Sequence, residues 1–507
     1  MDNEIKKTPP EYRELILFLN DIEKNVLKII SSILSDKLKI NEVEILLAPW
    51  CRTVVHSIFG ALDNLKIDKK RELFFDNAPG ETIKFMEFSR SDSYLDYLEY
   101  GNKSYKINKT TRILKLPFFS NGKFLFFQPG LPKHIINKLI IYYFFSYKKL
   151  SSKRKEVYFS INNELRLKIF RELENRLDIN NKTWFAARLV EMLPRSLAEG
   201  LNYQIEKYSR NYKFRYIYSS DSWSSVDEFK IFAFAQRKLR KITFIGTPHS
   251  LNYSTLKNFW NRDYEISFMD KYLLWGSINI SNNNKCTPFY SNKYISKKYT
   301  LISKVNMDLP ILITGAARPS HTVEFPYTSS LFKTYLQNQI LISKIINQIL
   351  NKKVTIRTRE KNRGNQIENI IKEYKNLEFL SIDYQKNEFN KVLRNYSLHI
   401  TDNTSTTILD SFILNFPTII ILDNTYFKLS DVAQFSFTGL EKVGIFHKNI
   451  NSFSNHLVLI NNEINNWWNS ENVQIEISKF LDYHAGILVN TKNWKSNFEK
   501  TILSCNN

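Results

Sequence analysis

Residues 398–407 read LHITDNTSTT, and they are followed by ILDSF at 408–412 and by PTIIILD at 417–423. The apolar run that ends before Asp402 predicts a buried strand, and the run from 417 predicts a second one. The hydroxyl-rich segment between them predicts a tight loop that leads into a helix. Backbone N–H groups and hydroxyls at the positive end of a helix dipole suit a phosphate. This unit therefore predicts an α/β protein that holds a nucleotide-type ligand at its strand ends.

The alternation of strands and helices continues on both sides of this unit, and it predicts parallel sheets with crossover helices. The expected strands cover residues 216–220, 241–246, 271–276, 309–314, 353–358, 377–382 and 397–401, and the expected helices cover 227–239, 329–350 and 388–395.

A polar stretch rich in Asn, Lys and Tyr between residues 281 and 304 predicts a domain boundary. We expect an N-terminal α/β domain over 1–304 and a C-terminal Rossmann-like domain over 305–507. The first domain begins with a helix over 11–38, and residues 43–50 read as a strand that precedes a second helix. The apolar spacing after residue 461 predicts helices that pack back on the body.

The composition narrows the class of protein. The chain has 507 residues, of which 43% are hydrophobic, so it can bury large cores. Its net charge of +22 reflects either a lysine-rich solvated surface or attraction to an anionic membrane or polymer. No nucleic-acid-binding motif accompanies the charge, so we expect no nucleic-acid partner.

Cysteine usage and the N-terminal sequence suggest a compartment. The three cysteines are far apart and form no CxxC pair, which suits a reducing environment. The polar N-terminus lacks the core of a signal peptide. We therefore expect a cytoplasmic protein, with peripheral contact at the inner membrane as an option.

Three loops at strand ends of the C-terminal half could form an anion site lined with hydroxyls. Small residues let backbone approach a ligand, arginines offer forked donors to phosphate, and a Ser/Thr loop begins a helix. The alternative is that Thr404 or Ser405 only caps that helix. The candidate residues of this anion site are Gly315, Arg318, Arg357, Arg359, Asp402, Thr404, Ser405, Thr406 and Thr407.

Two acidic side chains and one imidazole are candidate catalytic groups in the N-terminal half. Glu199 precedes a glycine, Asp221 follows the strand that ends at Ser220, and His249 follows the strand that ends at Gly246. Such groups are what a group-transfer site needs as nucleophile, base and anion-handling donor. Asp221 could instead cap a helix, and His249 could make structural hydrogen bonds. No Asp-x-Asp motif lies in a suitable loop, so we expect no metal.

Several blocks resemble a family of transferases from bacterial surface-carbohydrate gene clusters, those for O-antigen and capsule. The resemblance covers most of the chain and is looser between residues 68 and 164. The matching blocks are LLAPWCRTVVH at 46–56, LPRSLAEG at 193–200, EFKIFAFA at 228–235, TSTTILDSFILNFPTIIILD at 404–423, LEKVGIFH at 440–447 and NNWWNS at 465–470.

The family is similar to GT-B glycosyltransferases, which have two Rossmann-like domains facing a cleft. The resemblance implies that the C-terminal domain binds a nucleotide sugar and the N-terminal domain a glycan acceptor, which is lipid-linked in such pathways. Relatives that use CMP-linked acidic sugars, including retaining β-Kdo transferases and polysialyltransferases, have a comparable Ser/Thr loop. The implied donor is a CMP-linked ulosonic acid such as Kdo, with no other cofactor.

A retaining transfer of this type implies a carboxylate nucleophile. We expect Asp221 in this role, Glu199 as acid/base, with the two roles exchangeable, and His249 stabilising the leaving phosphate or sugar oxygens. The expected acceptor- or sugar-binding residues are Arg52, His56, Ser250 and Asn252.

One block departs from the family pattern. Members carry Gln-His-Gly where this chain has Pro248-His249-Ser250, so His249 is retained and its neighbours are not. Two alternatives to this enzyme stay open, and the departure bears on the second. One is a transferase for a CDP-linked polyol phosphate, and the other is a carbohydrate-binding scaffold without catalysis.

Overall fold

The computed structural model covers the whole chain. It describes residues 10–60, 110–114, 122–142, 147–150, 154–179, 182–210, 212–220, 222–277, 284–294, 301–315, 329–358, 371–372, 374, 377–384, 387–423, 427–486 and 494–503.

The first of two six-stranded sheets is parallel and has the order β3-β2-β5-β6-β7-β8. The edge strand β8 contains Pro288, and an edge position tolerates the missing N–H of proline. The strands are β2 (Phe124–Phe126), β3 (Tyr147–Lys149), β5 (Tyr216–Ser219), β6 (Thr243–Gly246), β7 (Lys271–Trp275) and β8 (Cys286–Phe289). A separate antiparallel pair joins β1 (Thr110–Leu114) to β4 (Arg154–Tyr158).

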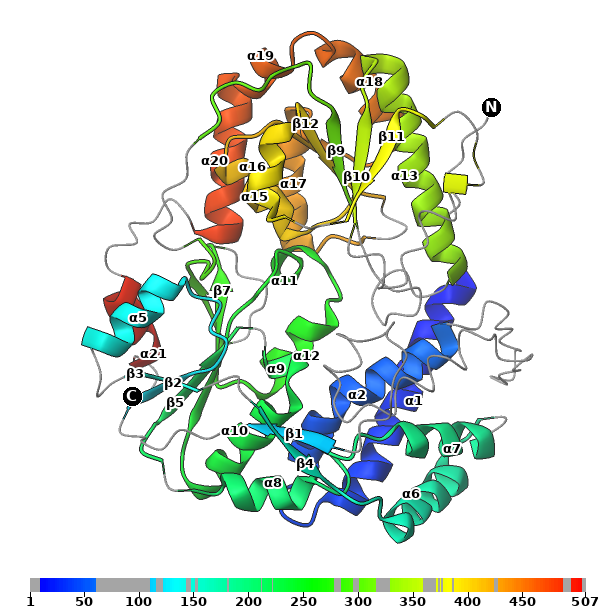
Figure 1. Ribbon diagram of the computed structural model, residues 1–507, viewed down its shortest axis with the longest axis vertical. Coiled ribbons are helices and arrows are strands. Elements are labelled where there is room, and N and C mark those ends of the chain that lie inside the picture. The colour runs from blue at the N-terminus through cyan, green and yellow to red at the C-terminus, as the bar shows by residue number, and fades with distance from the viewer. Residues whose placement is uncertain are drawn as a thin grey trace. The chain divides into compact units, whose positions relative to one another are not determined.

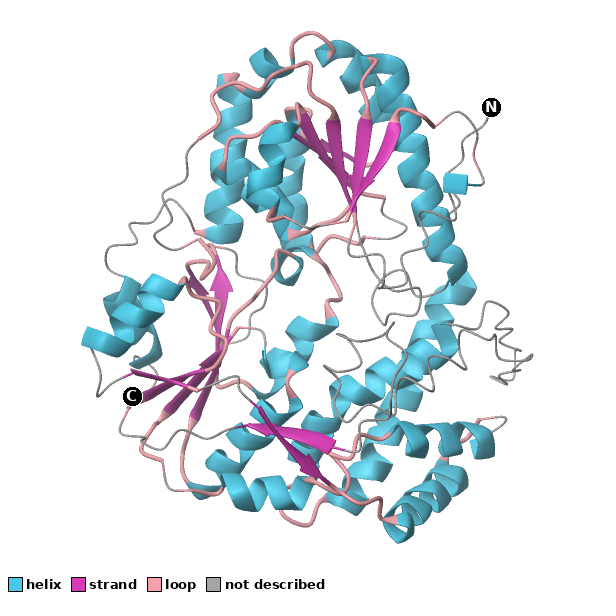
Figure 2. Cartoon of the chain, in the orientation of Figure 1, coloured by secondary structure: helices cyan, strands magenta, loops and turns pink. Residues whose placement is uncertain are grey.

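The second sheet is also parallel and has the order β11-β10-β9-β12-β13-β14. Counted along the chain, this is the Rossmann order 3-2-1-4-5-6. Figure 1 shows β9 to β12 fanned side by side, and the strands are drawn in magenta in Figure 2. They are β9 (Ile311–Thr314), β10 (Val354–Arg357), β11 (Leu380–Asp383), β12 (Leu398–Thr401), β13 (Thr418–Ile421) and β14 (Phe446–His447).

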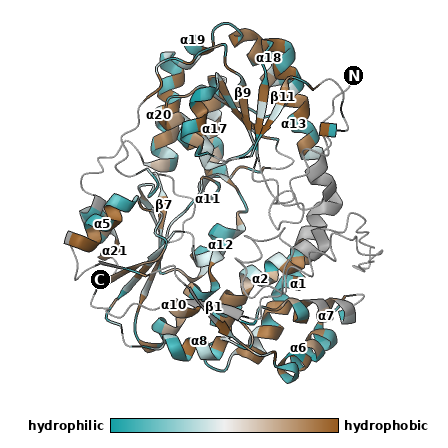
Figure 3. Cartoon of the chain, in the orientation of Figure 1, coloured by the Kyte–Doolittle hydropathy of each residue, from teal (hydrophilic) through white to brown (hydrophobic). Residues whose placement is uncertain are grey.

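Buried aliphatic residues fill the centre of the second sheet. Ile311, Leu312 and Ile313 of β9 are fully buried, and this strand is brown in the hydropathy view of Figure 3. Strands covered on both faces read as continuous apolar runs because neither face meets water. The predicted α/β architecture with two Rossmann-like sheets is therefore confirmed.

Helices connect and cover the strands. In the N-terminal half they are α1 (Pro10–Leu34), α2 (Ile40–Gly60), α5 (Lys133–Tyr142), α6 (Asn163–Arg176), α7 (Lys182–Met192), α8 (Leu201–Tyr208), α9 (Ser222–Ser225), α10 (Asp227–Leu239), α11 (Asn252–Thr255) and α12 (Trp260–Phe268). Farther along the chain they are α13 (Ser329–Leu350), α15 (Phe389–Val392), the 3-10 turn η2 (Leu393–Asn395), α16 (Thr406–Ile413), α17 (Asp431–Lys442), α18 (Ile450–Ile460), α19 (Ile464–Trp468), α20 (Glu471–Ala485) and α21 (Trp494–Leu503).

The predicted strand over residues 43–50 is wrong, because these residues belong to helix α2. Val43, Leu46, Leu47 and Trp50 are all buried at helical spacing, so burial on one helix face explains the apolar run. The helix continues through Pro49, although a proline inside a helix has no N–H to donate to the preceding turn.

The C-terminal helices pack back on the body, as predicted. Phe480 of α20 contacts the rings of Phe412 on α16 and Phe437 on α17. Buried His484 of α20 lies 3.0 Å from the hydroxyl of Ser254 and 2.8 Å from that of Ser436. These contacts join the C-terminal helices to both α11 and α17.

The chain forms two compact units. The first comprises Met1–Pro129, His134–Phe244 and Pro319–Phe332, and the second comprises Gly130–Lys133, Ile245–Arg318 and Lys333–Asn507. The expected domain boundary near residue 304 lies inside the second unit, between β8 and β9. The functions expected of the two domains stay predictions. No helix in the described ranges has the length and apolar character needed to cross a bilayer.

Candidate functional site

The strand order of the second sheet reverses between β9 and β12. Successive strands run outward from β9 through β10 to β11, and the chain then returns to place β12 on the other side of β9. The N–H of Asp402 donates to the carbonyl of Thr314 at 3.3 Å, so the ends of the two strands stay joined. Loops diverge at such a switch point, which is where ligands of open α/β sheets bind.

The loop after β12 forms the N-terminus of α16. Ser405 is the N-cap, and its hydroxyl accepts a 3.3 Å hydrogen bond from the N–H of Thr407. The Asn403 side chain accepts a 3.1 Å bond from the N–H of Ser405. Ser405 therefore caps the helix, as the alternative interpretation predicted. Ser405, Thr406 and Thr407 stay partly exposed, so the cap does not exclude a ligand from this turn.

A chain of hydroxyls and one imidazole lies beneath the loop. The Thr407 hydroxyl contacts that of Ser405 and lies 3.4 Å from that of Thr314. The Thr314 hydroxyl lies 2.7 Å from Nε2 of His399, and Nδ1 of His399 lies 2.9 Å from the Ser411 hydroxyl. Burial lowers the pKa of His399 to about 3, so its ring is neutral at pH 7. The network therefore holds the loop by neutral hydrogen bonds.

The Asp402 side chain points to α13. Its carboxyl accepts hydrogen bonds from the Tyr335 hydroxyl and, at 2.9 Å, from the Gln339 amide. Burial raises the pKa of Asp402 to about 7, and the two hydrogen bonds oppose that rise. Asp402 thus anchors the loop to a helix.

Gly315 follows β9 and lies against the same cluster. A Cβ at this position would be 1.8 Å from Nε2 of Gln339 and 2.6 Å from the Tyr335 hydroxyl. A larger residue at this position would force these side chains to move. The predicted close approach of backbone to a ligand at Gly315 stays a prediction.

A segment between β6 and β7 of the first sheet contacts this loop. The Thr404 hydroxyl donates a 2.8 Å hydrogen bond to the side-chain oxygen of Asn252, at the start of α11. Thr404 is fully buried. A short antiparallel bridge between Leu256 and Leu429 reinforces the contact, together with a 2.8 Å bond from the N–H of Ser430 to the carbonyl of Thr255. These residues belong to the second unit.

His249 lies three residues before Asn252 on that segment. Its Nδ1 is 3.2 Å from the hydroxyl of Tyr253, and Tyr253 donates at 3.0 Å to Oε1 of Glu265. The other oxygen of Glu265 accepts a 2.8 Å bond from Tyr272. His249 is half-buried, whereas Tyr253, Glu265 and Tyr272 are fully buried. The carbonyl of partly exposed Ser250 accepts from the N–H of Tyr253 at 3.4 Å.

The predicted arginine donors are only partly described. Arg357 is buried, pairs with Asp383 on the neighbouring strand β11 and donates to the carbonyl of Asn387. This guanidinium therefore links β10 to β11 and to the residues that follow β11. Arg318 and Arg359 lie outside the described residues.

Lys293 and Tyr294 are two residues that the sequence analysis did not assign. Lys293 lies 2.7 Å from one oxygen of Asp410 on α16, and the Tyr294 hydroxyl donates to the other at 3.0 Å. The Tyr294 hydroxyl also lies 3.4 Å from the carbonyl of Thr406. No spacing signal in the sequence linked residues 293–294 to α16.

The carboxylates predicted for catalysis belong to the first unit. Glu199 accepts hydrogen bonds from Nε and Nη2 of Arg166 at 2.7 and 3.0 Å, and its side chain is 5% exposed. This bidentate pair favours a structural role, and catalysis by Glu199 stays a prediction. Asp221 lies outside the described residues. Its neighbours Ser220 and Ser222 both donate to Gln128, which follows β2.

Arg52 and His56 form a buried network with Glu23. The guanidinium of Arg52 lies 3.1 Å from Oε2 of Glu23, and Nε2 of His56 lies 3.2 Å from the same oxygen. Desolvation is the main cause that lowers the pKa of His56. The network fastens α1 to α2, and acceptor binding by Arg52 and His56 stays a prediction.

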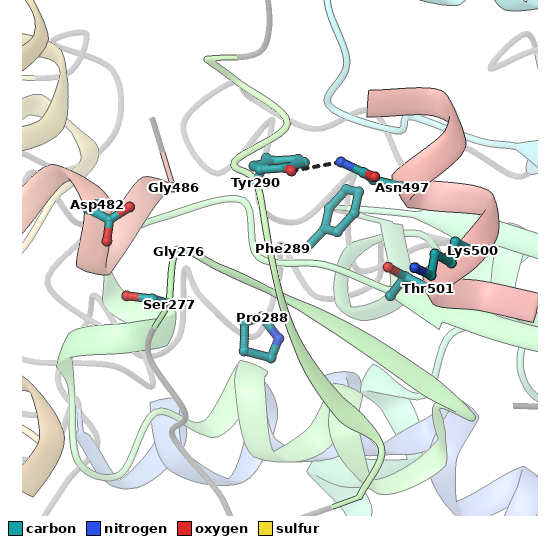
Figure 4. Close-up of a pocket in the computed structure, with 10 residues that line it drawn as sticks. All are labelled: Gly276, Ser277, Pro288, Phe289, Tyr290, Asp482, Gly486, Asn497, Lys500 and Thr501. Carbon is teal, nitrogen blue, oxygen red and sulfur yellow. Dashed lines mark hydrogen bonds between the residues drawn. The ribbon is translucent and has the colours of Figure 1, made fainter. Parts of the chain in front are cut away.

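A pocket of about 400 Å³ lies elsewhere in the second unit (Figure 4). Tyr290 accepts a 2.8 Å hydrogen bond from Asn497 at its edge. None of the predicted site residues lines it. The lining residues are Gly276, Ser277, Pro288, Phe289, Tyr290, Asp482, Gly486, Asn497, Lys500 and Thr501.

The structure therefore brings together some of the predicted residues. The residues joined around the switch point are Asn252, Gly315, Asp402, Thr404, Ser405, Thr406 and Thr407, with His249 on the segment that carries Asn252. Within the described ranges, no three His, Cys, Asp or Glu side chains gather as metal ligands would. Transfer without a metal stays a prediction.

The fold and site define an α/β protein with a Rossmann-ordered sheet and a hydroxyl-rich helix N-terminus at its switch point. The chain belongs to the LIC12162 family of transferases, whose family model matches residues 81–502. The protein is therefore a transferase. No curated protein matches the chain.

Solved structures show distant similarity. TarM is 14% identical, with a TM-score of 0.39 over 63% of this chain and 60% of TarM. Anabaena HepE in complex with UDP-glucose is 9% identical, with a TM-score of 0.39 over 75% of this chain and 99% of HepE. S. aureus MnaA with UDP is 10% identical, with a TM-score of 0.38 over 75% of this chain and 96% of MnaA.

Proposed function

We propose that this transferase is a GT-B-type glycosyltransferase that holds a nucleotide-sugar donor at the switch point of its second sheet. The observation that carries the proposal is the N-terminus of α16, where Ser405, Thr406 and Thr407 offer partly exposed hydroxyls. A helix N-terminus carries partial positive charge and oriented N–H groups, which favour a phosphate. Membership of a transferase family supports this use of the site.

The proposed donor is a CMP-linked ulosonic acid such as Kdo. A CMP-linked sugar has one phosphate, which suits the single helix N-terminus of the described site, whereas UDP- and GDP-sugars carry two. The resemblance in the Ser/Thr loop supports the same class. The carboxylate of the sugar would need a second cationic group, for which Arg318 and Arg359 are the proposed residues.

The proposed chemistry is transfer with retention. Asp221 attacks the anomeric carbon, the bond from that carbon to the phosphate oxygen breaks, and CMP leaves with the electron pair. An acceptor hydroxyl then displaces the Asp221 carboxylate and gives its proton to a base. Glu199 was the expected acid/base, but its pairing with Arg166 makes His249 the better supported base.

The proposed acceptor is a lipid-linked glycan of a surface polysaccharide, and the proposed place of action is the inner face of the membrane. The net charge of +22 supports attraction to anionic lipids there. Vesicle co-sedimentation tests this part. Equal binding to neutral and anionic vesicles at low salt would contradict it.

The donor proposal is tested with the full-length protein. Binding of CMP, CDP, UDP and GDP is measured by calorimetry, and transfer from CMP-Kdo, CDP-glycerol and UDP- or GDP-sugars is followed by mass spectrometry. We expect CMP to bind and CMP-Kdo to be consumed. Binding of UDP or GDP without CMP would contradict the donor class. A product carrying glycerol phosphate would instead favour the polyol-phosphate reaction.

A further inference from the structure

His249 is the first residue of a buried hydrogen-bonded path. The path runs from Nδ1 of His249 to the Tyr253 hydroxyl and from that hydroxyl to the carboxylate of Glu265. The His249 and Tyr253 rings meet edge to face with centroids 4.9 Å apart. All three residues belong to the second unit. The path joins a half-buried imidazole to a fully buried acid.

The direction of each hydrogen bond follows from counting protons. A tyrosine hydroxyl has one hydrogen, and Tyr253 donates it to Oε1 of Glu265. The hydroxyl oxygen can then only accept from His249, so Nδ1 of the imidazole carries the proton. In the neutral ring, Nε2 then has the lone pair. Glu265 thus sets the tautomer of His249 through Tyr253.

A second tyrosine keeps Glu265 in place. Tyr272 donates to Oε2 at 2.8 Å, so each oxygen of the carboxylate has a tyrosine donor. Burial and the charge of Glu265 raise the pKa of Tyr272, so Tyr272 keeps the proton that it donates. A Cβ on Gly246 would be 2.7 Å from the Tyr272 ring, so the glycine before the His249 loop is packed against this donor.

We propose that Tyr253 and Glu265 are positioning residues that hold His249 with its proton on Nδ1, so that Nε2 accepts the proton of the acceptor hydroxyl during transfer. The acceptor oxygen bonds to the anomeric carbon, its proton moves to Nε2, and the group displaced from that carbon leaves with the electron pair. The same bonds form and break whether the acceptor displaces the phosphate directly or displaces the Asp221 carboxylate from a covalent intermediate. The inference rests on the proposed glycosyl transfer.

The variant Tyr253→Phe removes one oxygen from the path and keeps the ring that packs against His249. The matched control is Tyr290→Phe, which removes a tyrosine hydroxyl of the same unit that accepts from Asn497 in the pocket away from the predicted site. We expect Tyr253→Phe to lower kcat by roughly 10- to 100-fold with little change in the KM of the donor. The control should stay within about threefold of the unmodified protein.

A spectroscopic readout separates this inference from the proposed reaction. Ring ¹⁵N resonances are recorded at a pH above which they no longer change, so that the ring is neutral, and His249 is assigned by the signal lost in His249→Gln. We expect protonated Nδ1 in the unmodified protein and in Tyr290→Phe, and loss of that preference in Tyr253→Phe.

The outcomes separate as follows. Protonated Nε2 in the unmodified protein, or an unchanged tautomer in Tyr253→Phe, overturns the positioning role. A changed tautomer with normal kcat overturns the proton-transfer step. If the unmodified protein transfers no sugar from any donor while Nδ1 is protonated as expected, the proposed function fails, and with it the catalytic use of the path.

Discussion

The hydroxyl of Thr404 donates a 2.8 Å hydrogen bond to the side chain of Asn252, 152 residues earlier in the chain. The bond joins the loop after β12 to the segment that carries His249. It lies within one compact unit. Two groups of residues that the sequence analysis assigned separately, to donor and to acceptor, therefore meet at one place.

Replacing Thr404 with Val should weaken this junction. The side chain keeps its shape, but the partly exposed Asn252 oxygen loses its donor, which costs about 1 kcal/mol. Urea unfolding measures this loss, and calorimetry measures the accompanying weaker binding of nucleotide. The control is Thr438→Val on α17, where an exposed hydroxyl bonds only within its own helix. Equal effects of the two substitutions would contradict a special role for Thr404.

Much of the fold could be predicted because, in a long helix, the spacing of apolar residues shows which face is buried. The helices over 227–239 and 329–350 were predicted with the bounds that α10 and α13 have. The segment 43–50 was misread because a short apolar run is shared by buried strands and buried helix faces. Its helical state depends on packing against α1, which no local pattern encodes.

The site was harder to predict because its contacts join distant parts of the chain. Strand pairing places Arg357 beside Asp383, a partner that its spacing in the sequence did not indicate, and phosphate binding by Arg357 stays a prediction. Asp402 was assigned to the ligand, and the structure turns it to Tyr335 on α13. Sequence spacing could identify the loop at a strand end, but not which side chains the sheet register would bring beside it.

Asp402 should give the stability an unusual dependence on pH. Its pKa rises from 3.8 to about 7 on folding, so the unfolded state releases its proton first as the pH rises. The contribution of Asp402 to stability is therefore present below about pH 4 and is lost progressively up to about pH 7. The variant Asp402→Asn does not titrate in this range, so it lacks this loss. The Gln339 amide can turn over and accept from the new amide group. Relative to the unmodified protein, the variant should gain about 2–3 kcal/mol between pH 5 and pH 8 in urea unfolding. A constant difference would contradict the raised pKa.

His484 should make the protein less stable at acidic pH, whereas Asp402 should make it less stable as the pH rises. Burial lowers its pKa from 6.5 to about 3, so only the unfolded state takes up a proton between these values. The stability that His484 contributes is present above about pH 6.5 and falls as the pH drops toward 3. At pH 5 the loss is about 2 kcal/mol. His484→Gln should be less stable at pH 7 but should lack this acid sensitivity. An equal acid response in both proteins would show that His484 is not buried in its neutral form.

Gly315→Ala should disturb the anchor of Asp402. The new Cβ would meet Gln339 at 1.8 Å, and such overpacking costs about 1–3 kcal/mol. Adding Gln339→Ala should recover part of the loss, since it removes the clashing atom. Gly439→Ala on α17 is the control, because its Cβ would meet only the side chain of Glu476, which is partly exposed. Additive losses in the double variant would show that the Gln339 contact is not the cause.

The most direct test of the proposed donor site is the affinity for CMP of the unmodified protein and of the variants Ser405→Ala and Thr407→Val. The control is Asn449→Ala, which removes the corresponding N-cap from α18 in the same unit. We predict that the first two variants bind CMP at least about 10-fold more weakly, the loss of one charge-assisted hydrogen bond, while the control binds as the unmodified protein does. Equal affinity in all four proteins, each folded, would contradict phosphate binding at the N-terminus of α16.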